Sequence, residues 1–283
     1  MKLAVNFSDA LLALLKENPD LPIDYIKVPT EPFPDCFEQY FVGKTFRPLL
    51  SHVNQPDVLD LLHIDKEKRV NIPLVTKILE LSAPIHLSTH VNSQIDYFPE
   101  YAPSQHCNDP KLADSIKTRF LEAVQIYQAN FQVPLIIENF PYYSFAYECR
   151  IGSEPEFISE LCMAANCGFL LDISHARVSA DFLKMDILQY LDLLPLQLTK
   201  EIHVSGTLKF EGAGFLWDAH TELEQFDYDL IDYVLQKANP VVITIEYGGF
   251  PNYQKTLEGG YLILNRNDTQ QLTNMINKLK GEK

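Results

Sequence analysis

The sequence lacks the signatures of several large classes of protein. It contains no GxGxxG and no GxxxxGK[ST] segment, so the glycine-rich turns that hold the phosphates of dinucleotides and nucleoside triphosphates are missing. No stretch approaches the ~18 to 20 consecutive apolar residues that a membrane-spanning helix needs. The five cysteines are odd in number and form no CxxC pair, which argues against a disulfide framework and a thiolate zinc site. We therefore expect a soluble protein of the reducing cytoplasm without a membrane partner.

Basic residues are also scarce, because 23 Lys and Arg stand against 38 Asp and Glu and give a net charge of −15. A surface of that sign repels a phosphate backbone, and no run of basic residues is interleaved with aromatic ones. Nucleic acid is therefore not an expected partner. Near the N-terminus, Asn6, Ser8 and Asp9 interrupt the apolar residues, so we expect a strand followed by a helix there and not a secretion signal.

The 283 residues are 46% hydrophobic, which is enough to bury a large core, and we expect residues 1–283 to form a single domain. Short apolar or β-branched runs occur at 2–7, 24–28, 48–53, 84–91, 134–140, 168–175, 201–206 and 241–247. Segments of helical period separate them, most clearly at 109–131, 154–167, 179–194, 227–238 and 267–283. Eight strands alternating with helices predict a (β/α)8 TIM barrel. An open doubly wound sheet is the alternative, and the missing phosphate-binding turn disfavours it.

Long segments follow the fourth and seventh predicted strands, at 92–110 and 207–225. In barrels the loops at the carboxyl ends of the strands carry the active site, so these segments predict a covered pocket. Ordinary variation in loop length is the simpler explanation. Aromatic residues in such loops either line a pocket or only pack, and the candidates are Tyr142, Tyr143, Phe145, Tyr147 and Trp217.

Histidines and carboxylates recur at or just beyond the carboxyl ends of the predicted strands. They are His52, His90, Glu138, Asp172, His175, His203, Asp218, His220 and Glu246. Taken singly, a histidine at a strand end is more often a packed residue, and an aspartate there commonly caps a helix. Taken together, four neighbouring carboxylates are too costly to bury unless cations neutralise them. Imidazoles and carboxylates are the ligands that divalent metals accept, so the set predicts a metal site.

The size of this set predicts two or three ions, because one ion takes about four to six ligands. Glu138, at a central strand end, is suited to bridge two of them. Asp172 would come from the end of a rigid strand and His175 from the first turn after it. His63, His86 and His106 are left out, and His86 is expected to be packed or hydrogen-bonded because it lies near the start of its strand.

The spacing of the nine residues resembles the trinuclear metal set of the type-four apurinic endonucleases, which are xylose-isomerase-like barrels. The surrounding sequence is more similar to the multinuclear non-haem iron-dependent oxidative enzymes that modify peptides. The similar segments are PLLSHV, IIENFPYY, GFLLDISHA, EIHVSGT, WDAHTE and ITIEYGG. Many members of that family carry Asn-Asn where this chain has Ser174-His175, a feature that resembles the branch that makes the copper-chelating peptide methanobactin.

This resemblance implies two or three iron ions of mixed Fe(II) and Fe(III) state, with dioxygen as co-substrate. The reaction would oxidise a cysteine of a ribosomally made precursor peptide to an oxazolone with a neighbouring thioamide, with a small partner protein presenting the peptide. Under this interpretation the three ions would be held by His52, His90 and Glu138, by Glu138, Asp172, His203 and Glu246, and by His175, Asp218 and His220. Glu246 is the candidate catalytic base.

Three other functions remain open from the sequence. The same ligands would serve a metal-dependent hydrolase of the apurinic endonuclease class, which the acidic charge disfavours. A sugar isomerase or epimerase would need only one or two of the ions. The last possibility is a scaffold that binds a peptide without catalysis.

Overall fold

The barrel strands of the computed structural model lie where the apolar runs predict them. The structure describes residues 1–30, 47–54, 56–101, 109–144, 148–209, 214–248 and 268–281. The strands are β1 (Lys2–Asn6), β2 (Tyr25–Pro29), β3 (Leu49–Val53), β4 (Leu87–His90), β5 (Leu135–Glu138), β6 (Gly168–Asp172), β7 (Thr199–Val204) and β10 (Val242–Ile245). They close in the order β1-β10-β7-β6-β5-β4-β3-β2, and each neighbouring pair is parallel. The predicted (β/α)8 TIM barrel is confirmed.

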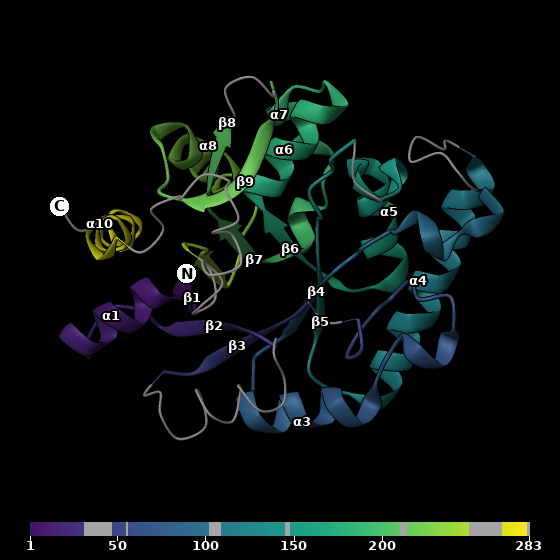
Figure 1. Cartoon of the computed structure of the whole chain (residues 1–283), viewed down its shortest axis with the longest axis horizontal. Coiled ribbons are helices and arrows are strands. Elements are labelled where there is room, and N and C mark those ends of the chain that lie inside the picture. The colour runs from purple at the N-terminus through teal and green to yellow at the C-terminus, as the bar shows by residue number, and fades with distance from the viewer. Residues whose placement is uncertain are drawn as a thin grey trace, which may run out of the picture.

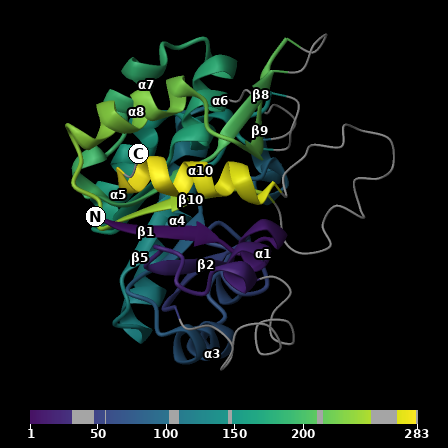
Figure 2. The same ribbon diagram turned by 90° about the vertical axis from the view of Figure 1, so that its left-hand side faces the viewer.

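Helices surround this barrel (Figure 1). They are α1 (Asp9–Glu17), α3 (Ile72–Ser82), α4 (Pro110–Asn130), α5 (Pro155–Ala165), α6 (Ile173–Leu183), α7 (Ile187–Leu193), α8 (Gln225–Leu235) and α10 (Thr269–Lys280). Short 3-10 helices are η1 (Lys66–Lys68), η2 (Ile95–Tyr97), η3 (Pro99–Tyr101), η4 (Arg150–Ser153) and η5 (Leu196–Leu198). Helix α10 packs against α1, so the two ends of the chain lie close together (Figure 2). Among the described helices, none is both long enough and apolar enough to cross a bilayer.

The prediction of one helix over residues 179–194 is wrong, because two helices occupy this region. Helix α6 begins directly after β6 and ends where Lys184 adopts the left-handed conformation, with φ of 58°. Helix α7 then starts from Asp186, whose side chain accepts hydrogen bonds from the backbone amides of Leu188 and Gln189. The chain therefore turns between the helices and starts again from a new N-terminal cap.

The segment after the seventh strand is also more ordered than the expected loop. Strands β8 (Gly206–Lys209) and β9 (Leu216–Thr221) pair antiparallel in a two-stranded sheet outside the barrel. The hairpin packs against α6 and extends beyond the barrel strands (Figure 2). At Gly206 an added Cβ would lie 2.3 Å from the carbonyl oxygen of Glu222, so only glycine allows the two strands to approach this closely.

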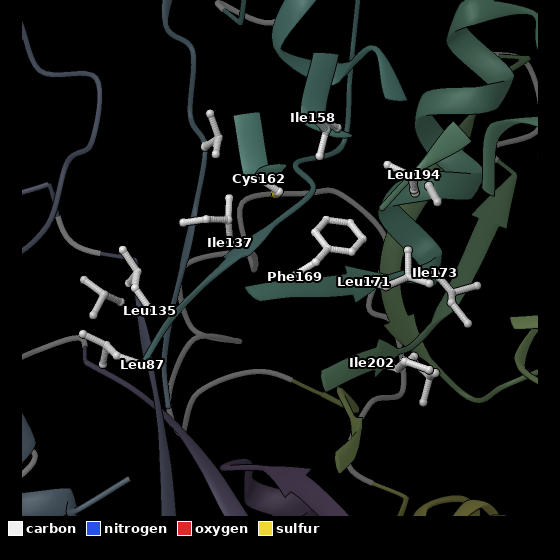
Figure 3. Packing of buried hydrophobic residues seen from close by; sticks show 14 of the residues in the cluster. Leu87, Leu135, Ile137, Ile158, Cys162, Phe169, Leu171, Ile173, Leu194 and Ile202 are labelled. Carbon is white, nitrogen blue, oxygen red and sulfur yellow. The ribbon is translucent and has the colours of Figure 1, made fainter. Parts of the chain in front are cut away.

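Alternate residues of each barrel strand face the helices or the interior. Outward-facing side chains form the main hydrophobic core, and Figure 3 shows Ile137 and Phe169 of β5 and β6 near Ile158 and Cys162 of α5. The inward-facing residues change character along the barrel axis. A small apolar cluster of Ala4, Leu50 and Val242 fills one end of the interior, and buried polar side chains such as Lys27, Ser88 and Glu201 lie further along it.

Candidate metal centre

All nine side chains predicted to form the site meet at the carboxyl end of the barrel. The strand pairing explains part of this arrangement, because His90 is in register with Glu138 across β4 and β5, and Asp172 with His203 across β6 and β7. Side chains that pair in this way on the inner face of a barrel lie next to each other. The deepest members are fully buried, with Glu138 1% exposed and both Asp172 and His203 0% exposed.

Glu138 lies between four imidazoles. Its Oε2 atom is 3.3 Å from Nε2 of His52 and 3.4 Å from Nε2 of His90. Its Oε1 atom is 3.3 Å from Nδ1 of His175 and 3.5 Å from Nδ1 of His203. The two oxygens of one carboxylate thus face two different pairs of histidines, which is the arrangement that a bridging ligand requires.

The pair Asp172 and His175 sits at the junction of β6 and α6. Asp172 ends the strand and also caps the helix, because its Oδ1 accepts a 2.7 Å hydrogen bond from the backbone amide of His175. The cap fixes His175 in the first helical turn. Its Nδ1 donates to the carbonyl oxygen of Asn139 at 2.8 Å, which directs Nε2 toward Asp218, 3.3 Å away. The spacing of three residues between Asp172 and His175 therefore reflects the geometry of a helix N-terminus.

Asp218 and His220 come from β9, outside the barrel. The Nε2 atom of His220 is 3.0 Å from Asp218 Oδ2 and 3.6 Å from Glu246 Oε2, while its Nδ1 faces the carbonyl oxygen of Gly248 at 3.3 Å. His220 has φ of 50°, a left-handed conformation that costs a non-glycine residue about 1 kcal/mol or more. The hairpin thus holds a strained backbone at the point where it completes the cluster.

The pKa values of the cluster show that its carboxylates favour positive charge on neighbouring histidines. Burial alone lowers the pKa of both His175 and His203, but the carboxylates of Asp172 and Asp218 raise that of His175 well above its usual range, and Glu246 and Glu138 do the same to His203. For His220, burial is again outweighed, mainly by Asp218, and the pKa rises to about 9. Burial and the neighbouring carboxylates raise the pKa of Asp172 to about 7 against the opposing charge of His175.

The other carboxylates of the cluster are ionised. Burial raises the pKa of Glu138 and Asp218, yet the adjacent imidazoles hold both well below the usual value, and Glu246 falls to about 2 between His203 and His220. Burial is the main reason that the pKa of His52 lies well below its usual value. Protons on the imidazoles therefore balance the carboxylates whenever no metal ion does so.

The chemistry of the donor atoms fits metal ions. Within the described part of the chain, three ligand atoms of the cluster are buried without a hydrogen-bond partner, namely Glu138 Oε2, Asp172 Oδ2 and His203 Nδ1. Such groups are costly to bury unless something neutralises them. Donor atoms lie within 4.8 Å of one another in three sets, which are His52, His90 and Glu138; Glu138, Asp172 and His175; and Asp172, His203 and Glu246.

These sets differ in detail from the division of ligands that the sequence suggested. The first set is the same as the expected one. Glu138 belongs to both the first and the second set, and Asp172 belongs to both the second and the third. His175 groups with Glu138 and Asp172, whereas Asp218 and His220 fall in none of the three sets although both lie near His175 or Glu246. Two carboxylates shared between adjacent sets are suited to a cluster of ions and not to separate single-metal sites.

Sequence reasoning missed the polar residues that support this cluster. Ser205 donates a 2.9 Å hydrogen bond from Oγ to Asp218, and Ser174 donates to the carbonyl oxygen of Ser205 at 2.6 Å. The excluded His86 is hydrogen-bonded, as expected, with Nε2 2.6 Å from an oxygen of Glu201. The available signal was position, because Glu201 and Ser205 each lie two residues from His203, the first on β7 and the second directly after it.

Aromatic side chains border one side of the cluster. The rings of Tyr143 and Trp217 lie 4.9 Å apart, and the Tyr143 hydroxyl oxygen accepts a hydrogen bond from the backbone amide of Asp218 at 3.2 Å. Tyr142 is buried and packs at 6.3 Å against Phe182. Phe145 and Tyr147 lie outside the described residues, as does His106.

Comparison with known proteins assigns the chain to a family. Residues 111–259, just over half of the sequence, match the family described as RiPP precursor modification enzymes MbnB/TglH/ChrH. The chain belongs to this family. RiPPs are ribosomally made peptides that enzymes then modify, so the expected resemblance is confirmed at the level of the family. The matched region contains seven of the nine cluster residues, and only His52 and His90 precede it.

A curated relative is the UPF0276 protein of Acaryochloris marina, which is 30% identical over 186 residues, or 63% of this chain and 64% of that protein. The chain therefore spans a little under two thirds of the length of this relative. Among solved structures, a xylose isomerase-like protein of Rhodospirillum rubrum has a TM-score of 0.57 at 12% identity and covers 100% of this chain and 99% of its own. Endonuclease IV of Thermus thermophilus has a TM-score of 0.56 at 13% identity, covering 99% of this chain and 100% of its own. Identities this low establish the fold alone, which is the expected xylose-isomerase-like barrel.

Proposed function

We propose that this protein is a multinuclear iron- and dioxygen-dependent oxidase that modifies a cysteine of a ribosomally made precursor peptide. The family supports the peptide substrate, and the donor set supports a polymetal centre. The single observation that carries the proposal is the pair of shared carboxylates, Glu138 and Asp172, each with a buried oxygen that has no hydrogen-bond partner among the described residues.

The nine residues of the cluster would hold the ions, with Glu138 and Asp172 between adjacent positions. When bound, iron would supply the redox chemistry and the affinity for dioxygen and for the substrate thiolate. Mixed nitrogen and oxygen ligands also suit manganese and zinc, so iron enters the proposal through the family. Mixed Fe(II) and Fe(III) states are part of the same proposal.

The open side of the cluster is the proposed entrance for the peptide. The side chains of His90 and His220 are 18% and 29% exposed, whereas the opposite members are fully buried. Tyr143 and Trp217 border this region and offer flat apolar surfaces that a peptide can contact. Glu246, whose side chain is 13% exposed and has Oε2 3.6 Å from Nε2 of His220, is the proposed acceptor for the cysteine proton.

The finer assignment is to the methanobactin type of reaction, which gives an oxazolone and a thioamide. Ser174-His175 supports it, because Ser174 hydrogen-bonds to the loop after β7 while His175 joins the cluster. A small partner protein that presents the peptide in the cytoplasm belongs to this proposal. The net charge of −15 favours a partner or peptide leader with a basic surface.

The test is to purify the protein anaerobically and measure its bound metal. Oxygen uptake and peptide mass are then followed with the precursor peptide and partner encoded beside it. We expect two or three iron ions per chain and oxygen consumption that depends on the cysteine of the peptide. A Cys→Ser peptide is the matched control and should give no uptake. Tightly bound zinc without oxygen consumption would contradict the proposal.

The alternatives are separated by two further assays on the same preparation. Cleavage of a duplex with an abasic site would indicate the hydrolase instead, and interconversion of a ketose with its epimer would indicate the sugar enzyme. The likeness to endonuclease IV and the xylose isomerase-like protein shows the fold alone, so it favours neither alternative.

A further inference from the structure

A buried ion pair lies in the barrel interior beneath the metal cluster. Nζ of Lys27 on β2 is 2.8 Å from Oε2 of Glu201 on β7, and the two side chains are 2% and 0% exposed. Strands β2 and β7 are not neighbours in the barrel, so the pair spans its interior. Replacing a buried ion pair by apolar residues is often neutral or stabilising, so stability does not explain its presence.

Both oxygens of Glu201 are fully used. Oε2 accepts from Lys27 and lies 2.6 Å from His86 Nε2, while Oε1 accepts from Thr244 Oγ1 at 2.5 Å and lies 3.1 Å from Nε2 of His203. Glu201 is therefore a carboxylate that can only accept hydrogen bonds.

This carboxylate determines which nitrogen of His203 carries hydrogen. Because Glu201 only accepts, the hydrogen must sit on Nε2 of His203, and the other nitrogen is left for the cluster. That nitrogen, Nδ1, is 3.1 Å from Oε1 of Glu246 and has no hydrogen-bond partner within the described residues.

The other end of the ion pair acts on His52 in the same way. Lys27 donates a 2.8 Å hydrogen bond to Oγ of Ser88, and Ser88 in turn donates to the carbonyl oxygen of Ser51 at 3.3 Å. The hydroxyl hydrogen of Ser88 is thus used, so Ser88 accepts from Nδ1 of His52 at 2.8 Å. His52 Nε2 then faces Glu138 without a hydrogen.

We propose that Lys27 and Glu201 are positioning residues that fix the tautomers of two metal ligands, so that His203 binds through Nδ1 and His52 through Nε2. The inference rests on the proposed metal centre and adds the coordinating atom of each ligand. Carboxylates behind metal-binding histidines orient the ring and raise its basicity, and their loss typically lowers metal affinity 10- to 100-fold.

The first test uses the wild-type full chain loaded with Zn²⁺, a diamagnetic probe, and nitrogen NMR of the histidine rings. We expect His203 to keep a hydrogen on Nε2 and to show a metal-shifted Nδ1, with the opposite pattern for His52. A His203 ring that coordinates through Nε2 would overturn the proposal. This measurement needs no variant, so it does not depend on whether a variant folds.

The second test is a Zn²⁺ titration of Glu201→Gln, with circular dichroism to confirm the fold. We expect 10- to 100-fold weaker binding and a mixture of His203 tautomers, which a general loss of stability would not produce. The matched control is Glu122→Gln, which breaks an ion pair with Arg69 outside the barrel interior and should leave the affinity unchanged. If Glu201→Gln does not fold, Lys27→Met/Glu201→Gln, which also removes the unpaired ammonium, takes its place.

The outcomes separate the two proposals. Unchanged affinity and a single His203 tautomer in the folded variant would overturn the positioning role alone, because the wild-type centre would still bind metal. A wild-type chain that binds neither Zn²⁺ nor Fe²⁺ would overturn the metal centre and the positioning role together.

Discussion

The side-chain amide of Asn139 exchanges two hydrogen bonds with the backbone of Asp172. Its Nδ2 donates to the Asp172 carbonyl oxygen and its Oδ1 accepts from the Asp172 amide, both at 2.9 Å. The side chain thus continues the pairing of β5 and β6 beyond the last residue of β5. Because the carbonyl oxygen of Asn139 also accepts from His175 Nδ1, one residue orients two members of the cluster.

Replacing this side chain should loosen the cluster without removing any ligand. In Asn139→Ala the backbone groups of Asp172 lose their partners, and a buried unsatisfied group costs about 1–3 kcal/mol. We expect a lower free energy of unfolding by about that amount in urea titrations and weaker metal binding. The control is Asn130→Ala at the exposed end of α4. Equal stability of both variants would show that the amide bridge is dispensable.

Asp172→Asn should make the metal-free protein more stable and should weaken its metal binding. The raised pKa of about 7 means that the buried carboxylate is unfavourable at higher pH in the metal-free protein. An asparagine keeps the Oδ1 cap on α6 and removes the charge. We expect metal-free Asp172→Asn at pH 8 to unfold with a free energy on the order of 1 kcal/mol higher than wild type, while binding metal far more weakly. A variant that is less stable and binds metal normally would refute the assignment of Asp172 as a ligand.

The metal-free protein should lose stability as the pH rises from about 7 to 9. His220 has a pKa of about 9 in the fold against 6.5 ordinarily, so the folded state binds more protons than the unfolded chain in this window. Its contribution to stability is complete below pH 6.5 and disappears as the pH passes 9, and the raised values of His175 and His203 act in the same direction.

This pH dependence is measured as the melting temperature of chelator-treated protein at several pH values. The metal-loaded protein should show little change over the same range, because the ions take over the role of the protons. Metal binding should also release protons, so the affinity should rise with pH. A melting temperature that increases between pH 7 and 9 without metal would contradict the electrostatic picture.

Gly206→Ala should disturb the hairpin that carries Asp218 and His220. The new Cβ would lie 2.3 Å from a backbone oxygen, and overpacking of this kind costs about 1–3 kcal/mol. We expect lower stability and weaker metal binding together. Gly214→Ala is the comparison, because its site is open and only its φ of 74° opposes the substitution, at about 1 kcal/mol. A metal affinity in Gly206→Ala no lower than in Gly214→Ala would show that the hairpin position does not control the cluster.

The barrel and the meeting of the nine side chains were predictable because both follow from local patterns. Runs such as 134–140 and 168–175 read as strands, and parallel strands bring their carboxyl ends to one edge, so the separation of His52 from Glu246 in sequence did not matter. Two elements were missed although weak signals existed. Asp186 is a recognisable N-cap inside the predicted helix 179–194, and Asp218 and His220 alternate with apolar neighbours as a strand does.

The ion pair of Lys27 and Glu201 could not be predicted, because nothing local connects two residues on opposite sides of a barrel. Their inward direction follows only after the register of β2 and β7 is known. Several statements from the sequence stay predictions, among them that the nine residues bind metal, that the metal is iron, that a partner protein presents the peptide and that residues 1–283 form one domain.

The order of the proposed ligands along the chain determines when, during synthesis, the complete set is present. His52 lies on β3, whereas Glu246 follows β10, the strand that closes the barrel against β1. A nascent chain whose last strand is still inside the ribosome lacks part of the proposed donor set, so the complete set exists only after the barrel has closed.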